Sequence, residues 1–381
     1  MISETITTKW GKKAREVGRK RLTPIAAEID KNGVYDPRNL EILIEEGLIA
    51  PPIPKKYGGL GLSEAAFQEL MREISRASTS AASMITCQMM TAYGIMSGGS
   101  ESQKKKYLPL MAKGKLIGTP AITEVHAGSD VGAIRTRAER DGKRYVLNGE
   151  KALISYLGIA DIYLVFAKTS PDKGNKGITA FVVASSNPGL KCGEPLRKMG
   201  QRGLSTGSLT LSNCLVPLGD RIGEEGGGFH IAMDLLNRSR LVVASQALGT
   251  ATAAFEAALE YAKKRTAFGK PIIAQQAISF KLADMAIKLH NAQLSANHAA
   301  RKVDAGEDYI LDIAIAKVYA SEIAREVTND AVQIHGGIGY TSEYPVERFY
   351  RDQRVMELYG GTSEIQRLVI SRILSGESKL K

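Results

Sequence analysis

This chain has few cysteines, and polar residues interrupt its longest apolar stretches. The three cysteines, Cys87, Cys192 and Cys214, lie far apart in the 381-residue sequence and form no CxxC pair. That arrangement argues against a disulfide framework and against a zinc site, so we expect no metal. It also favours a reducing, cytoplasmic setting. The most apolar stretch, residues 241–255, is short and contains hydroxyl and amide side chains. We therefore expect a buried helix there and no membrane span.

Aromatic residues are also few, at 6% of the chain. Lysine and arginine number 51 against 40 acidic residues, which gives a formal net charge of +11. The basic clusters at 12–13, 104–106 and 263–265 are short and far apart. A nucleic-acid-binding protein is expected to concentrate its positive charge on one face. The dispersed charge therefore indicates an ordinary basic surface, which can attract phosphorylated ligands, and argues against nucleic acid as a partner.

Three regions of different character follow one another along the chain. Residues 1–117 carry apolar residues at helical spacing, interrupted by glycine and proline, and predict an N-terminal helical domain. Residues 118–225 contain short stretches rich in β-branched and aromatic residues between turn signals, which predict a central β-barrel or sandwich domain. Residues 226–381 return to long apolar-periodic segments and predict a C-terminal four-helix bundle. We therefore expect an α+β fold that is mainly α.

Local signals define the expected elements more closely. Ser63 follows a glycine-rich turn and is a candidate N-cap for a helix that runs towards Ala77. The chain is expected to be helical again from Phe229 onward. This order excludes the alternating strands and helices of a Rossmann fold, and neither a GxGxxG motif after a strand nor a P-loop is present. The expected strands include 145–147, 161–167, 178–183 and 208–211, and the expected bundle segments are 240–264, 275–305, 309–334 and 362–374.

The candidate cofactor segment is residues 122–130, which read ITEVHAGSD. A loop with hydroxyl groups and small residues allows close approach of a ligand to the backbone, but by itself it is a weak signal. Five further motifs accompany it: KKYGGLG at 55–61, GEEGGGF at 223–229, YAKKRTAFGK at 261–270, QIHGGIGY at 333–340 and GTSEIQ at 361–366. In order and spacing, this set resembles the acyl-CoA dehydrogenase family.

The resemblance implies a fold, a cofactor and partners. The fold would be a helical domain, a β-domain and a four-helix bundle, with FAD between the β-domain and the bundle. The substrate would be an acyl-CoA thioester. The family is usually a homotetramer in which each FAD also touches a neighbouring subunit, and it implies electron-transfer flavoprotein as the electron acceptor.

The resemblance also assigns cofactor contacts. Ile122, Thr123 and Ser129 would contact the flavin and its phosphates, with Thr123 near the redox-active ring nitrogen. Ser155 matches a hydroxyl that closes over the flavin, and Leu153 stands where the family often has a tryptophan, so ring stacking is lost there. Arg265 and Phe268 match residues that reach the FAD of a neighbouring subunit, and Arg265 carries a planar cation suited to pyrophosphate. The remaining matches are Gln276, then Gln333, Gly336 and Gly337 at the adenine and phosphate end, and Thr362 and Glu364 at the start of the last helix.

The family reaction needs a base to remove an α-proton from the thioester, and most members carry a glutamate in the pattern YEGT. This chain reads Tyr359-Gly360-Gly361-Thr362, so Gly360 occupies the position of the base. Some members place the glutamate before an arginine on the first bundle helix, where this chain has Ser239-Arg240. The catalytic residue is therefore unknown. A serine hydroxyl without an activating partner is a poor base.

Substrate contacts are expected from Ser129, Arg240, Tyr359 and Gly360, of which Gly360 keeps a backbone N–H that could polarise the thioester carbonyl. Three mechanisms remain open. The base comes from elsewhere, the reaction needs no α-proton base, or the protein binds FAD without dehydrogenating a substrate. The space left by glycine suits a cyclic, branched or otherwise bulky acyl group. The nearby carboxylates Glu357, Glu343 and Asp234 are interpreted as structural or surface charges.

Two rival readings differ from an acyl-CoA dehydrogenase. One is a desulfinase-like or other non-oxidising flavoprotein of the family, acting on an acidic acyl-CoA. The other is a non-catalytic, nucleic-acid-binding relative, for which the dispersed charge gives little support.

Overall fold

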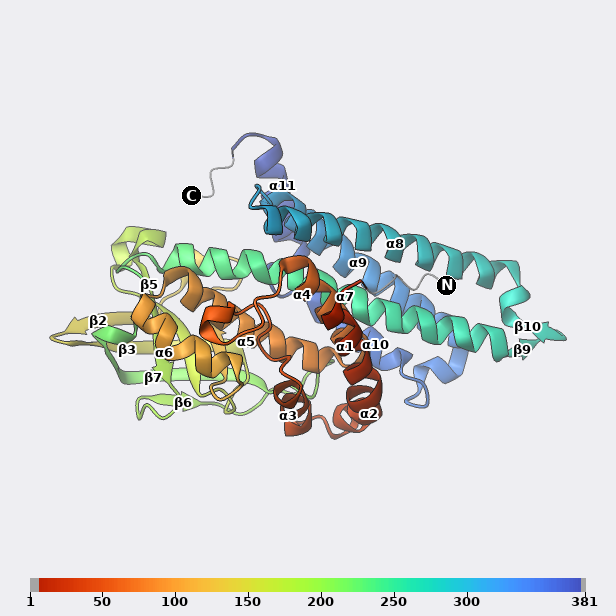
Figure 1. The fold of residues 1–381 in the computed structure, drawn as a ribbon, viewed down its shortest axis with the longest axis horizontal. Coiled ribbons are helices and arrows are strands. Elements are labelled where there is room, and N and C mark those ends of the chain that lie inside the picture. Colours follow the sequence, from red (N-terminus) through yellow and green to blue (C-terminus); the bar gives the residue numbers. More distant parts are fainter. Residues whose placement is uncertain (1–6, 378–381) are drawn as a thin grey trace.

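The structure is a computed structural model that describes residues 7–377. The β-domain occupies one end of the long axis, the helical bundle the other, and the N-terminal helices lie between them (Figure 1). Ser63 accepts a hydrogen bond from the Ala66 N–H at 3.3 Å, which confirms the predicted N-cap. The N-terminal helices are α1 (Lys9–Val17), α2 (Thr23–Asn32), α3 (Pro37–Glu45), α4 (Glu64–Ala77), α5 (Thr79–Gly98) and α6 (Glu101–Ala112).

The central domain is built on one eight-stranded sheet with the order β6-β7-β3-β2-β4-β5-β8, and β1 pairs in parallel with β4. Three of the four stretches predicted as strands lie within β3, β5 and β7, and the fourth, 161–167, begins one residue before β4, which confirms the β character of this region. The strands are β1 (Gly118–Ala121), β2 (Arg137–Asp141), β3 (Arg144–Ser155), β4 (Ile162–Lys168), β5 (Ile178–Ala184), β6 (Leu190–Cys192), β7 (Thr206–Pro217) and β8 (Arg221–Ile222).

The last region forms the expected bundle, with α7 as one continuous helix from Gly228. A short hairpin of β9 (Thr266–Ala267) and β10 (Lys270–Pro271) joins α7 to α8. By composition α7 could cross a membrane, but most of its apolar stretch is buried inside the protein, which accounts for that composition. The helices are α7 (Gly228–Lys264), α8 (Gln276–Ala305), α9 (Ile310–His335), α10 (Val346–Gln353) and α11 (Ser363–Leu374).

Buried apolar residues form two clusters that meet along α7. The first joins the N-terminal helices, the sheet and the start of α7, including Leu235 and Val242. The second lies among α7, α8, α9 and α10, and begins on α7 with Leu241 and Val243. Helix α7 therefore belongs to both cores, and the change from one to the other falls near residue 242.

Helix α7 approaches α4 closely at Gly249. A Cβ atom placed on Gly249 would lie 2.2 Å from the Arg72 carbonyl oxygen and 2.9 Å from the Ser75 Cβ. Beside this contact, the Ser75 hydroxyl donates to the Gln246 carbonyl at 2.8 Å. Because the obstacle is backbone, the helices would have to separate to admit a side chain.

We predict that Gly249→Ala lowers the free energy of unfolding by about 1–3 kcal/mol, because overpacking forces the two helices apart. The matched control is Glu260→Ala on the exposed side of the same helix, which should change it by less than about 0.5 kcal/mol. Urea unfolding followed by circular dichroism measures both. An unchanged or more stable Gly249→Ala variant would contradict the close packing of α7 on α4.

Candidate functional site

The loop at 122–130 leaves strand β1 and folds into a tight turn. The backbone N–H groups of Glu124 and Ala127 each donate to the other's carbonyl oxygen, at 3.0 Å in both directions. The Ala152 N–H donates to the Thr123 carbonyl at 2.8 Å and so ties the turn to β3. The loop therefore has a fixed position on the sheet.

The side chain of Glu124 anchors this loop from inside. It is 3% exposed and accepts hydrogen bonds from the Arg135 N–H at 2.6 Å and the Thr136 N–H at 3.0 Å. The wholly buried Lys151 ammonium lies 2.8 Å from its carboxylate and also donates to the Ile122 carbonyl at 3.1 Å. Burial alone would raise the pKa of Glu124, but the Lys151 cation and these donors lower it below its ordinary value. The carboxylate is thus ionised at neutral pH and holds the loop.

A bulge in β3 presents the next two predicted cofactor contacts. The pairing of β3 with β7 changes register within residues 151–154, and Leu153 there has φ +57° and is 63% exposed. Ser155 ends the strand and lies beside the Cys87 thiol. The structure therefore brings Thr123, Leu153 and Ser155 together at one part of the sheet. Ser129 lies further along the loop and is exposed.

The segment before α11 forms the second part of the site. Gly360 and Gly361 have φ angles of +65° and +89°. The Gly360 carbonyl accepts from Arg240 Nε at 3.4 Å, and the Gly361 carbonyl accepts from Lys317 Nζ at 2.8 Å. Gln366 Nε2 donates to both carbonyls. Within the described part of the chain, the N–H groups of the two glycines have no hydrogen-bond partner. The loop thus keeps two free backbone donors while its carbonyls are held.

Both cations that hold this loop are buried. Arg240 is 6% exposed and also donates to the Asn237 side chain at 2.7 Å, and burial lowers its pKa to about 10. Lys317 is wholly buried, and burial together with the nearby Arg240 cation lowers its pKa to about 8. Thr362 caps α11 by accepting from the Ile365 N–H at 3.3 Å, and Glu364 lies in the first turn.

No carboxylate occupies the position of a base beside Gly360 within residues 7–377. A Cβ atom at this glycine would meet Val243 Cγ2 at 3.4 Å and Ser239 Oγ at 3.9 Å, which is ordinary contact. The Ser239 hydroxyl donates to the Leu236 carbonyl at 2.8 Å. Among the residues that the structure describes, it has no basic partner that would make it a proton acceptor.

The carboxylates nearest in sequence have other partners or point to solvent. Glu357 is largely buried and lies 3.4 Å from Arg325 Nε. Asp234 lies 3.7 Å from Arg238 Nε on the same helix, and Glu343 is exposed. These positions agree with the interpretation of all three as structural or surface charges.

A chain of hydrogen bonds leads from Tyr359 into the interior. The Tyr359 hydroxyl donates to Gln246 Oε1 at 2.9 Å, and Gln246 Nε2 donates to Ser83 Oγ at 3.0 Å. The Ser83 hydroxyl donates to Gln201 Oε1 at 2.7 Å, and Gln201 Nε2 donates to the Asp352 carbonyl at 3.2 Å. Each side chain in this series donates to the next one, from Tyr359 towards Asp352. The Tyr359 hydroxyl proton is therefore used in a hydrogen bond to Gln246.

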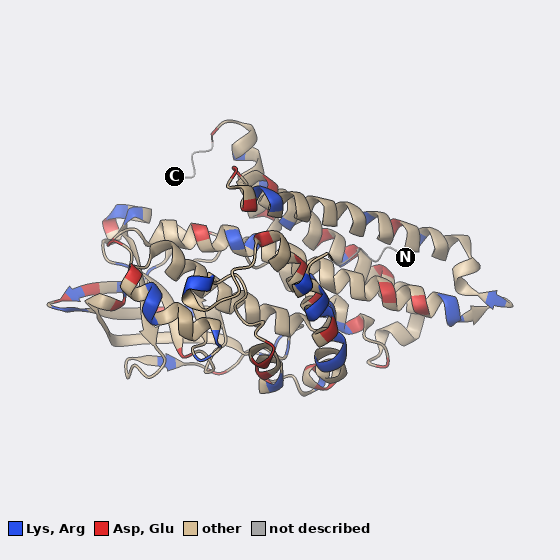
Figure 2. Cartoon of the chain, viewed as in Figure 1, with Lys and Arg blue, Asp and Glu red and all other residues tan. Residues whose placement is uncertain are grey.

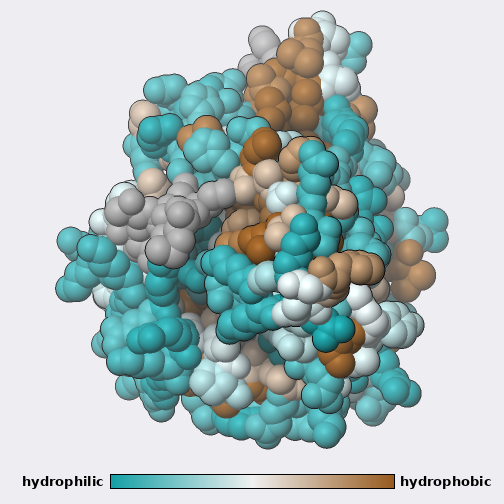
Figure 3. Space-filling model, turned by 90° about the vertical axis from the view of Figure 1, so that its right-hand side faces the viewer, coloured by the Kyte–Doolittle hydropathy of each residue, from teal (hydrophilic) through white to brown (hydrophobic). Residues whose placement is uncertain are grey.

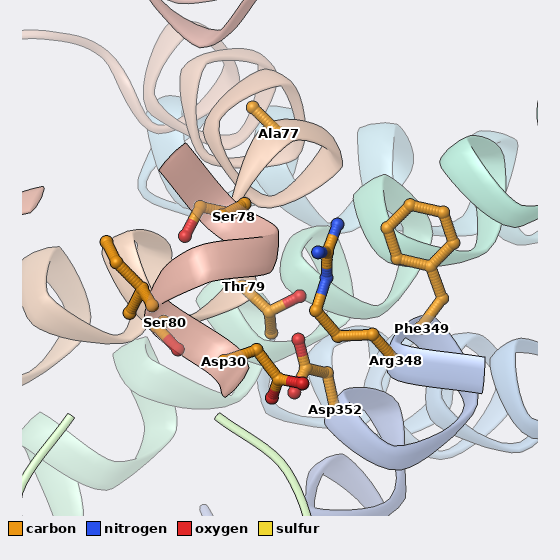
Figure 4. Close-up of a pocket in the computed structure, with 10 residues that line it drawn as sticks. Asp30, Ala77, Ser78, Thr79, Ser80, Arg348, Phe349 and Asp352 are labelled. Carbon is orange, nitrogen blue, oxygen red and sulfur yellow. The ribbon is translucent and has the colours of Figure 1, made fainter. Parts of the chain in front are cut away.

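This series of hydrogen bonds ends at Asp352, which lines a small cavity of about 10 Å³, the size of one water molecule. Figure 4 shows Asp352 and Asp30 at one edge of it, with Ser78, Thr79 and Ser80 of the α5 start nearby. Burial, and then the nearby Asp30 charge, raises the pKa of Asp352 to about 6. The cavity is too small for a cofactor or substrate.

Six of the predicted cofactor contacts lie at the opposite end of the bundle, where β9 and β10 project (Figure 1). Arg240 and Lys264 are 24 positions apart on the continuous helix α7, which corresponds to about 36 Å at 1.5 Å per residue. Tyr261 stacks on His335 at 4.3 Å and so joins the ends of α7 and α9. The residues at this end, all exposed, are Arg265, Phe268, Gln276, Gln333, Gly336 and Gly337.

Three family models match the chain in succession: Acyl-CoA dehydrogenase, N-terminal domain at residues 8–115, middle domain at 119–214 and C-terminal domain at 226–375. The chain belongs to the acyl-CoA dehydrogenase family. It is 44% identical to an acyl-CoA dehydrogenase of Bacillus subtilis over 96% of this chain and 97% of that protein. It is 42% identical to a 3-(aryl)acrylate reductase of Clostridium sporogenes, covering 94% and 96% respectively.

The fold agrees with a solved member of the family. Butyryl-CoA dehydrogenase from Megasphaera elsdenii superposes with a TM-score of 0.95 at 38% identity, covering 98% of both chains. The predicted order of helical domain, β-domain and bundle is therefore confirmed. Family membership makes the protein an FAD-dependent oxidoreductase of the acyl-CoA dehydrogenase type.

The buried charges that shape this site were not predicted from the sequence. Lys317 stands among small apolar residues of α9, with Ala316 and Ala320 also wholly buried. A lysine at a core position of an apolar helix could have indicated this site, because a buried lysine needs a specific partner. Glu124 and Lys151 gave no comparable signal, since their pairing depends on the contact between the loop and β3.

We predict that Glu124→Gln lowers the free energy of unfolding at pH 7 by about 3 kcal/mol, because it leaves the buried Lys151 ammonium without its counter-charge. The folded-state pKa of Glu124 lies below its ordinary value of 4.5. The ionised carboxylate therefore stabilises the fold above that value, and the stabilisation is lost as pH falls towards the folded-state pKa. The difference between wild type and variant should shrink below about pH 4.5.

Urea unfolding at pH 7 and in steps down to pH 4 measures this difference. Glu150→Gln is the control, because Glu150 is exposed on the adjacent part of β3. A loss of stability that is equal in the two variants would refute the anchoring role of Glu124.

Proposed function

We propose that this protein is an FAD-dependent oxidoreductase of the cytoplasm that acts on an acyl-CoA thioester with a non-standard acyl group, cyclic, branched or acidic. It is an atypical family member, with the catalytic base at neither usual position. The observation that supports the proposal is the loop at Gly360, which retains free N–H donors but carries no side chain. The Clostridium relative is named a reductase, so the direction of the reaction stays open.

The loop is suited to polarising a thioester carbonyl. Two adjacent N–H groups that lack a partner among residues 7–377 are the arrangement that stabilises a developing oxyanion. Arg240, Lys317 and Gln366 hold the carbonyls of the same glycines, so the donors are fixed before substrate binds. Tyr359 precedes them, and its hydroxyl is bound to Gln246. These residues bind and orient the acyl group.

The residues at the β3 bulge fit a flavin. The backbone of Leu153 is left-handed, and its apolar side chain is exposed beside the Thr123 turn. A flavin ring bound there would cover this side chain. Ile122, Thr123, Ser129, Leu153 and Ser155 would hold it from the β-domain. FAD, when bound, supplies the hydride acceptor. We further propose electron-transfer flavoprotein as the electron partner.

The distal contacts support a homotetramer. Arg265 and Phe268 lie too far along the bundle to join the β-domain contacts of their own chain, so a second copy must bring the two sets together. The end of the bundle shows apolar patches within a polar surface (Figure 3). Phe268 is 95% exposed, and Phe280, Ile287 and Leu294 are exposed at seven-residue spacing on α8. A partner subunit would cover such a stripe.

The alternative of nucleic-acid binding gains little from the charge distribution. Basic and acidic residues are interspersed over most of the molecule, and the densest basic run follows the N-terminal helix (Figure 2). In that run Arg15 pairs with Glu73 at 2.8 Å, and Arg21 pairs with Glu45 at 2.6 Å. Such pairing leaves less free charge for a phosphate backbone.

We predict that butyryl-CoA and octanoyl-CoA bleach the flavin of the wild-type protein slowly or not at all under anaerobic conditions. A positioned base typically contributes about 10²–10⁴-fold to the rate. Gly360→Glu should therefore raise the rate of bleaching by butyryl-CoA by about 100-fold. Stopped-flow absorbance of the oxidised flavin band measures both rates.

Gly360→Gln is the matched control, because it has the same size and backbone strain but no carboxylate, and it should give no gain. The left-handed φ of Gly360 costs a substituted residue about 1–2 kcal/mol, so thermal unfolding accompanies the kinetics. Rapid bleaching of the wild type by these straight-chain substrates would overturn the proposal of a non-standard acyl group and would require a base outside the two usual positions.

We predict that Arg265→Ala retains less FAD after gel filtration than Lys264→Ala does. Arg265 carries a forked cation suited to pyrophosphate, whereas Lys264 serves as a neighbouring exposed cation. FAD per protein is measured by absorbance, and the oligomer by light scattering. Equal retention in the two variants would remove Arg265 from the cofactor site, and a monomer with full FAD occupancy would refute the shared site.

A further inference from the structure

Two buried cations, Arg240 and Lys317, lie beside Gly360. Arg240 donates to the Gly360 carbonyl and to the neutral Asn237 side chain. Lys317 donates to the Gly361 carbonyl. Within residues 7–377 neither forms a direct ion pair, although the more distant carboxylates of Glu357, Glu322 and Glu364 act on Lys317. Removing a cation from water without a counter-charge is costly, so this point in the fold has an excess of positive charge.

The other buried cations among residues 7–377 are paired. Lys151 lies 2.8 Å from Glu124, and Arg72 Nε lies 3.6 Å from Glu73. Arg240, which is 6% exposed, has no such carboxylate among these residues. Since the fold supplies a carboxylate to the other two buried cations, Lys151 and Arg72, the exceptions at Arg240 and Lys317 indicate that a counter-charge comes from outside the chain.

The position for that anion is beside Gly360, where the chain carries no side chain. A Cβ atom there makes only ordinary contacts, with Val243 and Ser239. A carboxylate matches the planar fork of a guanidinium. The polar chain from Tyr359 through Gln246 to Ser83 closes the interior beyond the loop with committed hydrogen bonds, which favours a short acyl group.

We propose that Arg240 and the side-chain position left empty by Gly360 form a carboxylate site, which takes the second carboxylate of a short dicarboxylic acyl-CoA. The inference rests on the proposed acyl-CoA function and specifies the acidic class of acyl group. The substrate thereby supplies the negative charge that the chain lacks at position 360.

The test compares binding of succinyl-CoA and butyryl-CoA to the FAD-loaded protein by isothermal titration calorimetry and by the change in the flavin spectrum. These ligands have the same chain length and differ in a terminal carboxylate or methyl group. Succinyl-CoA should bind at least about 10-fold more tightly than butyryl-CoA, because its carboxylate can accept a charge-assisted hydrogen bond from Arg240. Arg240→Gln should abolish this preference. Arg238→Gln should retain it, because Arg238 is two positions away on the same helix and has Asp234 as its own partner.

A second variant tests the site without removing the arginine. Gly360→Glu places a carboxylate of the chain beside Arg240, so it should lose the preference for succinyl-CoA, whereas Gly360→Gln should keep it. This arm decides the question if Arg240→Gln does not fold.

The outcomes separate this inference from the proposed function. Equal affinity for the two ligands in the wild type, or a preference that survives Arg240→Gln, would overturn the carboxylate site and leave the acyl-CoA function standing. If neither thioester binds the FAD-loaded protein, the acyl-CoA function itself fails. Formate that tightens butyryl-CoA binding through Arg240, without any preference for succinyl-CoA, would overturn the assignment of the carboxylate to the acyl chain.

Discussion

Helix α7 belongs to two hydrophobic cores, and its continuity fixes the position of the candidate site. Its first turns pack with the N-terminal helices and the sheet, and its later turns pack with α8 and α9. The change of core falls at residues 239–243, where the helix also meets the loop of Gly360. A rigid helix through both cores fixes that meeting point relative to the sheet and to the bundle.

The loop itself is stabilised in an unusual way. Its two glycines have left-handed φ angles, and their carbonyls are held by the buried side chains of Arg240 and Lys317. Since buried ionic groups are costly, their presence at this point is more easily explained by function than by stability. The arrangement leaves backbone donors free and concentrates positive charge in one place.

The organisation of the fold could be read from the sequence because its signals are local. Ser63 caps its helix through a hydrogen bond three residues away, and the strands were visible as short β-branched stretches between turns. The cofactor motifs could likewise be recognised in order along the chain. The pairing of Glu124 with Lys151 could not, because it depends on which loop meets which strand.

The order of helical domain, β-domain and bundle can be predicted from the sequence, as can the family motifs, since these are properties of neighbouring residues. The folded chain was needed to show that Arg240 and Lys317 converge on the Gly360 loop without a direct ion pair among residues 7–377. It was also needed to show that Arg265 lies at the far end of the bundle from Thr123. Both facts depend on contacts between residues distant in sequence, and burial, which sets the energy of a charge, exists only after those contacts form.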